Sequence, residues 1–166
     1  MTALDECQRW VADIVVGLNL CPWAAEPLAR GGVRWRQSGG TTFEETVAEV
    51  VFEARLLTDG AAETTLLVLP SEVYAPDFGE LLELLDVAEA VLDAEELLDA
   101  VQLVAFHPDF QYADSEPDDP ANGTNRSPQP MVHLLRRTDI AAVRADGAAV
   151  AERNARVLRE RAEKGD

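Results

Sequence analysis

The sequence predicts a single α/β domain over residues 1–166, with a mixed sheet of about four strands packed by helices. Three observations predict this fold class: short apolar runs of strand length, amphipathic segments of helical period between them, and a chain length typical of one domain. Strands that alternate with helices favour parallel pairing through right-handed crossovers. We therefore expect three parallel strands, and a last strand that pairs antiparallel because no helix precedes it.

The first elements are predicted from periodicity. Apolar residues at spacings of three and four over residues 4–18 indicate a helix, and the glycine, asparagine and proline of residues 17–22 indicate its end. Residues 33–37 alternate apolar and polar side chains, so we expect a strand with Trp35 facing the core. Residues 42–45 form a capping box that opens the second helix.

Two nearly continuous apolar runs, residues 64–69 and 101–106, predict strands buried on both faces. A third helix is expected to begin at Asp77, between these two strands. Residues 131–137 could form a strand or a short helix, and their length favours a strand. A C-terminal helix is expected to bury Val150, Val157 and Leu158.

Residues 108–130 show no periodicity and are rich in proline, so a long irregular loop is predicted. Loops of this length within a domain are usually functional or disordered. Phe110 and Tyr112 are large side chains that favour packing, so we expect an ordered loop. The loop and its flanks, residues 107–137, are therefore the expected place of the functional site.

The net charge is −17, with Lys164 as the single lysine. This balance argues against nucleic-acid binding and against an anionic membrane surface, because both need Lys and Arg. An acidic surface aids solubility or adaptation to salt, and a cationic partner is the alternative. The N-terminus is acidic rather than basic and no apolar run reaches the length of a membrane span, so we expect a cytoplasmic protein.

The two histidines, His107 and His133, flank the long loop. If their strands are neighbours, both imidazoles could reach one pocket and serve as acid–base groups. His107, Asp109 and His133 are also a plausible ligand set for a divalent metal. The alternative is that both histidines are structural and that Asp109 hydrogen-bonds its own turn.

A second candidate site would bind an anionic group of a small molecule. Asn and Gly residues allow successive backbone amides to converge on an anion, and an arginine holds a carboxylate or phosphate with two hydrogen bonds. The residues predicted for this site are Asn122, Asn125, Arg126, Ser127 and Arg136. The alternative is that Arg126 only holds the loop in shape.

The two cysteines favour neither a disulfide scaffold nor a closed zinc site. Cys7 lies on the apolar stripe of the first helix and is expected in the core. Cys21 follows that helix and could act as a nucleophile or a metal ligand beside a histidine. The alternative is a small buried side chain next to Trp23.

Two segments resemble the signature of the domain-of-unknown-function 1415 family. The first is Gly-Leu-Asn-Leu-Cys-Pro-Trp-Ala at residues 17–24, and the second comprises Phe-His-Pro-Asp at 106–109, Asp-Asp-Pro-Ala-Asn at 118–122, Thr-Asn-Arg-Ser-Pro at 124–128 and His-Leu-Leu-Arg at 133–136. The resemblance implies a bacterial, single-domain protein and assigns no catalytic role to any residue. The family pattern has an aromatic residue where this chain has Gly123 and Gln129, which argues against stacking at these places.

The resemblance leaves in place a polar set worth testing: Cys21, His107, Asp109, Asn125, Arg126 and His133. Two functions fit this set. The first is an enzyme that acts on a small anionic metabolite, with His107, His133 and Cys21 as catalytic residues and a divalent metal as a possible cofactor. The second is a non-catalytic ligand- or protein-binding module with structural histidines, and a loop that merely completes the fold is the remaining alternative.

Overall fold

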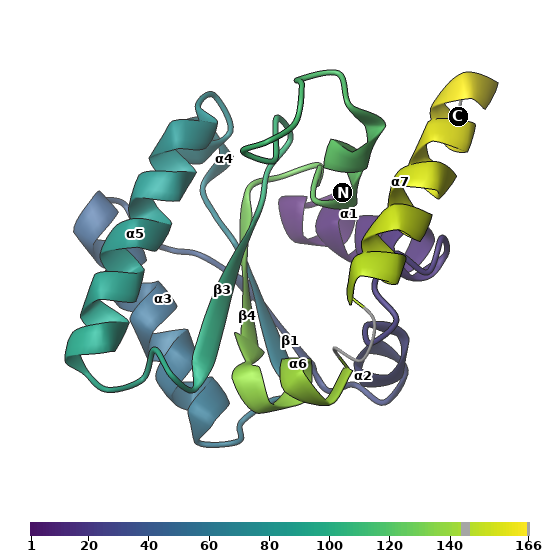
Figure 1. Cartoon of the computed structure of the whole chain (residues 1–166). Coiled ribbons are helices and arrows are strands. Elements are labelled where there is room, and N and C mark those ends of the chain that lie inside the picture. The colour runs from purple at the N-terminus through teal and green to yellow at the C-terminus, as the bar shows by residue number, and fades with distance from the viewer. Residues whose placement is uncertain (144–146, 166) are drawn as a thin grey trace.

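Residues 1–143 and 147–165, which the computed structural model describes, form a mixed sheet of four strands with helices on both faces (Figure 1). The elements follow in the order α1 (Ala3–Trp10), the π-helical turn η1 (Val11–Val16), α2 (Ala25–Ala29), β1 (Val33–Gln37), α3 (Phe43–Thr58), β2 (Thr64–Val68), α4 (Ser71–Tyr74), α5 (Phe78–Ala94), β3 (Val101–Phe106), the 3₁₀ turn η2 (Pro120–Thr124), β4 (Met131–Arg136), α6 (Arg137–Val143) and α7 (Gly147–Lys164).

The strand order in the sheet is β1-β2-β4-β3. β1 and β2 are parallel neighbours, and β4 pairs antiparallel with both β2 and β3. The three strands that follow helices therefore run in the same direction, as predicted, and β4 is antiparallel, as predicted. Because β4 inserts between β2 and β3, residues 131–136 lie in the middle of the sheet and His133 pairs with Leu66 on one side and Val104 on the other.

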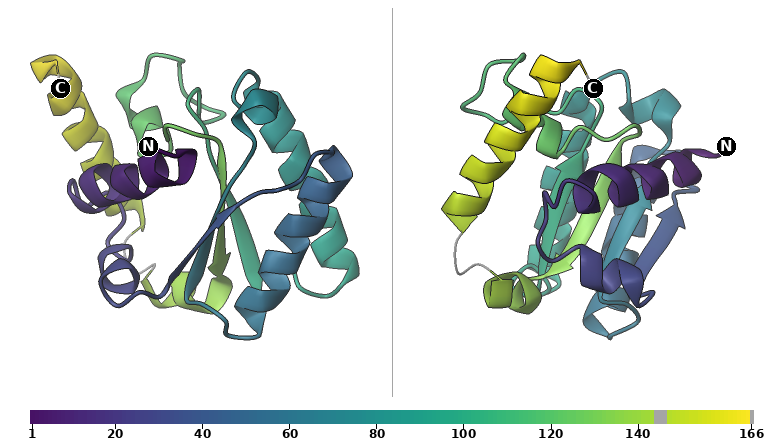
Figure 2. Two further views of the ribbon diagram at one scale, coloured as in Figure 1. Left: turned by 180° about the vertical axis from the view of Figure 1, so that it is seen from behind. Right: turned by 90° about the vertical axis from the view of Figure 1, so that its right-hand side faces the viewer.

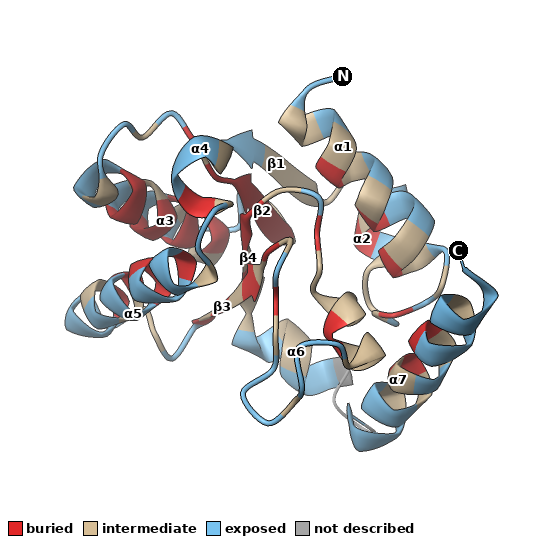
Figure 3. Cartoon of the chain, turned by 90° about the horizontal axis from the view of Figure 1, so that it is seen from above, coloured by how far each residue is buried: buried red, intermediate tan, exposed pale blue. Residues whose placement is uncertain are grey.

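One face of the sheet packs against α3 and α5 (Figures 1 and 3). This face carries alternate residues of each strand, as the period of two requires. The residues of β2, β3 and β4 in this core are Leu67, Val101, Leu103, Ala105, Val132 and Leu134. The predicted capping box of α3 is confirmed, since Thr42 accepts from the Glu45 amide. The predicted start of α5 is also confirmed, and Asp77 caps this helix by accepting from the Gly79 amide.

The buried carboxylate of Glu53 joins α3 to β1. Arg34 Nε donates to Glu53 at 2.6 Å and Arg36 Nε lies 3.3 Å from the same carboxylate. Both arginines therefore point to the α3 side of the sheet, whereas Trp35 packs in the second core on the opposite side.

The opposite face of the sheet is covered by α1, η1, α2 and α7, which Figure 2 shows from two sides. The first helix, predicted as one element, is α1 followed by the π-helical turn, and Cys7 is buried in it as predicted. The C-terminal region holds two helices, α6 and α7, where one was predicted, and Leu158 of α7 is buried. Across the described ranges, no helix is both long and apolar enough to pass through a lipid bilayer.

Candidate functional site

The two histidines lie on opposite faces of the sheet. His107 directly follows β3, and its position continues the series Val101, Leu103, Ala105, which faces α3 and α5. His133 belongs to the other series of β4, with Met131 and Leu135. The predicted meeting of both imidazoles in one pocket is therefore wrong, because the period of two in the strands separates them.

His107 is a structural residue. Its side chain is fully buried, with 0% exposure, and both ring nitrogens have protein partners. Nε2 donates to the Tyr74 carbonyl at 2.7 Å, and Nδ1 accepts from the Asp109 amide at 2.9 Å. The ring also packs 5.1 Å from Phe78. This imidazole joins the end of β3 to α4 and α5, and it has no free nitrogen for a substrate or a metal.

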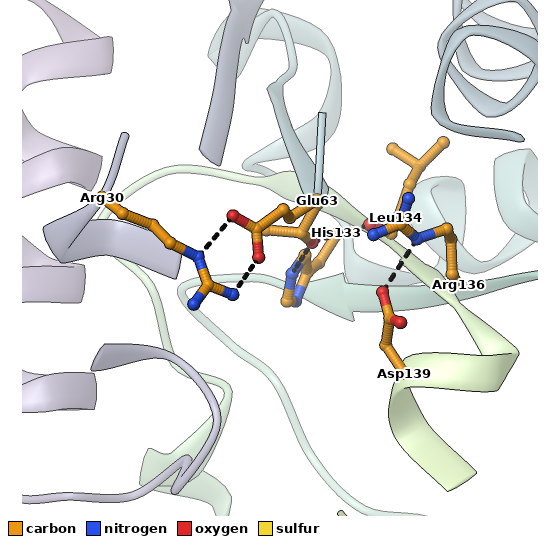
Figure 4. Close-up of polar contacts among 7 residues, drawn as sticks. Arg30, Glu63, His133, Leu134, Arg136 and Asp139 are labelled. Carbon is orange, nitrogen blue, oxygen red and sulfur yellow. Dashed lines mark hydrogen bonds and ion pairs between the residues drawn. The ribbon is translucent and has the colours of Figure 1, made fainter. Parts of the chain in front are cut away.

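His133 is held differently. Thr64 Oγ1 donates its one proton to the Leu134 carbonyl at 2.8 Å, so at 2.7 Å it accepts from His133 Nε2–H. Figure 4 shows the imidazole between the ion pairs Arg30–Glu63 and Arg136–Asp139. The second nitrogen, Nδ1, has no hydrogen-bond partner among the described residues and is not completely buried. No donor of the described residues therefore uses the lone pair of Nδ1.

Burial lowers the pKa of His133 from 6.5 to about 4. The apolar surroundings, which include the Phe106 ring stacked at 5.7 Å, disfavour the charged imidazolium. At neutral pH the ring is therefore uncharged, and it can accept a hydrogen bond or a proton at Nδ1.

A cavity of about 520 Å³, which we call the sheet pocket, lies on the His133 face of the sheet. β3 and β4 form its floor, and the end of η1, the following loop, α6, α7 and the end of η2 form its walls. Its apolar lining comprises Val15, Leu20, Trp23, Val104, Phe106, Leu135, Ile140 and Val150. Its polar lining comprises Cys21, Gln102, Thr124, Asn125, His133 and Asp139. The structure therefore brings together Cys21, Asn125 and His133 of the predicted set.

A smaller cavity of about 70 Å³, the inner cavity, adjoins the sheet pocket under α1. Cys21, Trp23 and His133 line both cavities. The thiol and the imidazole thus lie at the junction between the two spaces, although they are 112 residues apart in the chain.

The loop that carries Cys21 is held in place by α7. Asn19 has a φ of +51°, which turns the chain after η1. Arg153 donates to the carbonyls of Leu18 and Asn19 at 2.9 and 2.6 Å, and Asn154, buried in the interface, donates to that of Leu20 at 2.6 Å. These bonds fix the backbone before Cys21, which is half-buried. Cys7, by contrast, is fully buried, and desolvation raises its pKa to about 12.

The residues predicted to bind an anion have partners within the protein for their side chains. Arg126 donates to the carbonyls of Phe110 and Pro117, at 3.0 and 2.6 Å. Asn122 is buried and accepts from the Tyr112 amide at 3.0 Å. Ser127 donates to the Gln129 carbonyl at 2.5 Å. Arg136 donates to Asp139 at 2.8 Å.

The predicted metal ligands are not brought together either. His107 and His133 face opposite sides of the sheet, and the Asp109 side chain is exposed. Within residues 1–143 and 147–165, no group of three His, Cys, Asp or Glu side chains is arranged to hold a metal ion.

Sequence reasoning missed Thr64, Trp23, Gln102 and Asp139 as parts of the site. Thr64 is the residue that orients His133, but a threonine that begins an apolar strand carries no signal of this role. Trp23 lies in the same short segment as Cys21, and this proximity was the one signal that could have found it.

The fold and the site define a mixed α/β protein with a largely apolar pocket on one face of its sheet. The family model described as "Protein of unknown function (DUF1415)" matches residues 2–165, so this chain belongs to the DUF1415 family. The comparisons with the curated proteins and with the solved structures gave no match.

Proposed function

We propose that this protein binds a small, mainly apolar molecule in the sheet pocket, and that the His133 imidazole orients this molecule by accepting a hydrogen bond at Nδ1. The observation that carries the proposal is an uncharged imidazole with an open nitrogen at the floor of a cavity of about 520 Å³. Small-molecule sites are usually cavities of roughly 300–1,000 Å³ with apolar walls and a few oriented polar groups.

The proposal replaces the anionic metabolite that the sequence suggested. Arg126 and Arg136 were the expected anchors of an anion, and both donate to acceptors of the protein itself. The described lining residues include no cation, so an anion bound among them would lose its hydration without compensation. An uncharged or cationic molecule avoids this cost.

A titration with indole, a neutral planar probe, tests the proposal by two-dimensional NMR. We expect amide shifts that cluster at Cys21, Trp23, Val104 and His133. The variant Val150→Trp fills the pocket from α7 and should abolish these shifts, whereas Leu82→Trp, on the exposed side of α5, should leave them unchanged. Shifts spread over both faces of the sheet, or equal shifts in both variants, would contradict a binding site in the sheet pocket.

An enzyme is the second candidate, because a threonine orients the histidine and a thiol lines the same two cavities. In this mechanism the Cys21 thiol transfers its proton to His133 Nδ1 and attacks the substrate as a thiolate. The low pKa of His133 opposes it, since the imidazolium that the transfer creates is destabilised by burial. The rate of alkylation of Cys21 at neutral pH in the wild type and in His133→Gln decides between the two: a tenfold fall supports the enzyme, and an equal rate supports binding alone.

We also infer a reducing, cytoplasmic location and no nucleic-acid partner. Both cysteines are unpaired, which agrees with a compartment that keeps thiols reduced. A net charge of −17 opposes binding to a polyanion. Cell fractionation of the tagged protein and an electrophoretic shift assay with DNA and RNA test these two statements.

A further inference from the structure

Most of the free polar atoms on the described residues of the sheet pocket are hydrogen-bond acceptors. Asn125 uses its Nδ2 to donate to the Ala105 carbonyl at 3.2 Å, and its Oδ1 has no partner among the described residues. His133 uses its Nε2, so that Nδ1 remains as an acceptor. Thr124 also lines the pocket, but its hydroxyl proton is already donated to the Ala121 carbonyl at 2.9 Å. The unused polar atoms of these three residues accept hydrogen bonds and do not donate them.

Asp139 adds a carboxylate to the same wall. Its Oδ2 accepts from Arg136 Nε at 2.8 Å, and in the described part of the chain Oδ1 has no partner. The side chain is 30% exposed, so this end of the pocket remains in contact with water. Gln102 also lines the pocket, and its side-chain amide can donate or accept. It therefore does not change the excess of free acceptors over free donors.

Arg136 pairs with one oxygen of the Asp139 carboxylate and leaves the other free, and the other described arginines near the pocket donate to backbone carbonyls. Arg126 and Arg153 donate to backbone carbonyls of the two loops that border the pocket, and Arg137 donates to the Leu98 carbonyl at 2.8 Å. Among the described lining residues the charged side chain is an aspartate. On the scale of the whole protein, a net charge of −17 attracts cations and repels anions.

We propose that the molecule bound in the sheet pocket is an amine, with an apolar aryl or alkyl body and a protonated amino group. This inference rests on the proposed function and names the ligand class for the same site. The body lies between Trp23 and Phe106, and the three donors of the ammonium group point to His133 Nδ1, Asn125 Oδ1 and Asp139 Oδ1. An ammonium has three donors and no acceptor, which matches a wall of acceptors, and its position at the half-exposed Asp139 lets it keep part of its hydration.

Three probes of similar size and different head group test the ligand class: phenethylamine, 2-phenylethanol and 3-phenylpropanoate. Each is titrated into the full chain at pH 7, and binding is followed by the amide shifts of Cys21, Asn125 and His133. We expect phenethylamine to bind at least tenfold tighter than 3-phenylpropanoate, with 2-phenylethanol between them. If 3-phenylpropanoate binds as tightly as the amine, the ligand class is overturned while the proposed binding function stands. If none of the three probes binds, both proposals fail.

A charge-matched pair of variants locates the effect. Asp139→Asn should weaken the binding of phenethylamine at least fivefold and leave the affinity for 2-phenylethanol unchanged. Asp86→Asn removes the same charge from the exposed surface of α5, on the other side of the sheet, and should change neither affinity. If both variants weaken the binding of phenethylamine equally, the preference for an amine comes from the overall charge. The assignment of the amino group to Asp139 is then overturned.

Discussion

The Thr64 hydroxyl lies 2.7 Å from His133 Nε2, and this one bond sets which nitrogen of the imidazole faces the sheet pocket. Thr64 begins β2 and His133 lies in β4, so the antiparallel pairing of these two strands brings the groups together. The orientation of the only histidine that lines the pocket, among the residues described, therefore depends on the sheet itself rather than on a flexible loop.

His133 should make the stability of the protein depend on pH. Its pKa is about 4 in the folded chain and near 6.5 in the unfolded chain, so between these values the unfolded state binds more protons. The contribution of the neutral His133 to the free energy of unfolding is fully present above pH 6.5 and is lost as the pH falls toward 4. A difference of this size corresponds to about 3 kcal/mol at most.

The measurement is the free energy of unfolding from pH 4 to pH 7, for the wild type and for His133→Gln. The 31 acidic residues also titrate in this range, so the difference between the two proteins isolates the histidine. We expect the wild type to lose stability more steeply than the variant as the pH falls. Parallel curves would show that the imidazole is not desolvated in the folded protein.

His107→Ala should destabilise the fold by about 2–4 kcal/mol, because it removes two buried hydrogen bonds and leaves a cavity beside Phe78. Chemical denaturation measures this cost. The indole affinity of the folded variant should stay unchanged, since His107 faces away from the sheet pocket. A loss of binding in a variant that remains folded would place His107 in the site after all.

The two cysteines should differ in reactivity by about a hundredfold or more. Cys7 is fully buried and its pKa is raised to about 12, so it presents almost no thiolate at pH 8. Cys21 is half-buried and lines the sheet pocket. Iodoacetamide followed by peptide mapping should modify Cys21 alone in the folded protein, and Cys21→Ser should remain unmodified. Equal labelling of both thiols would mean that α1 does not pack as described.

Asn154→Ala should release the loop before Cys21. The Asn154 amide donates to the Leu20 carbonyl at 2.6 Å in a buried interface, and loss of a buried partner costs about 1–3 kcal/mol. Hydrogen exchange over residues 17–23 and alkylation of Cys21 should both become faster. Arg156→Ala, an exposed change on the same helix, is the control and should alter neither rate. An unchanged exchange rate in Asn154→Ala would show that α7 does not hold the loop.

Local patterns in the sequence were sufficient for the strands and the helix caps. The Thr42 and Asp77 caps depend on residues within one helical turn, and the β1 and β2 strands on runs of five residues, so each could be found without knowledge of the rest of the chain. The insertion of β4 between β2 and β3 depends on pairing over distances of about 70 and 30 residues, for which the sequence has no local signal.

Only part of the site could be predicted, because it too depends on contacts between distant parts of the chain. The strand before His107, residues 101–106, carries apolar residues on both faces, so alternation in polarity does not show clearly which way the next side chain points. Counting from Val101 by twos would have placed His107 with Leu103 and Ala105, away from His133. Cys21 reaches the pocket because α7, more than 130 residues later, fixes its loop.

Attachment of a benzyl group to Cys21 tests most directly whether the thiol and the imidazole share one pocket. The group is introduced with benzyl methanethiosulfonate as a disulfide, and the ring signals of the two histidines are recorded by ¹H–¹⁵N NMR before and after. We predict that the signals of His133, with a proton on Nε2 and none on Nδ1, shift strongly, while those of His107 stay in place. A shift at His107, or no shift at either ring in the fully modified protein, would contradict the sheet pocket as the functional site.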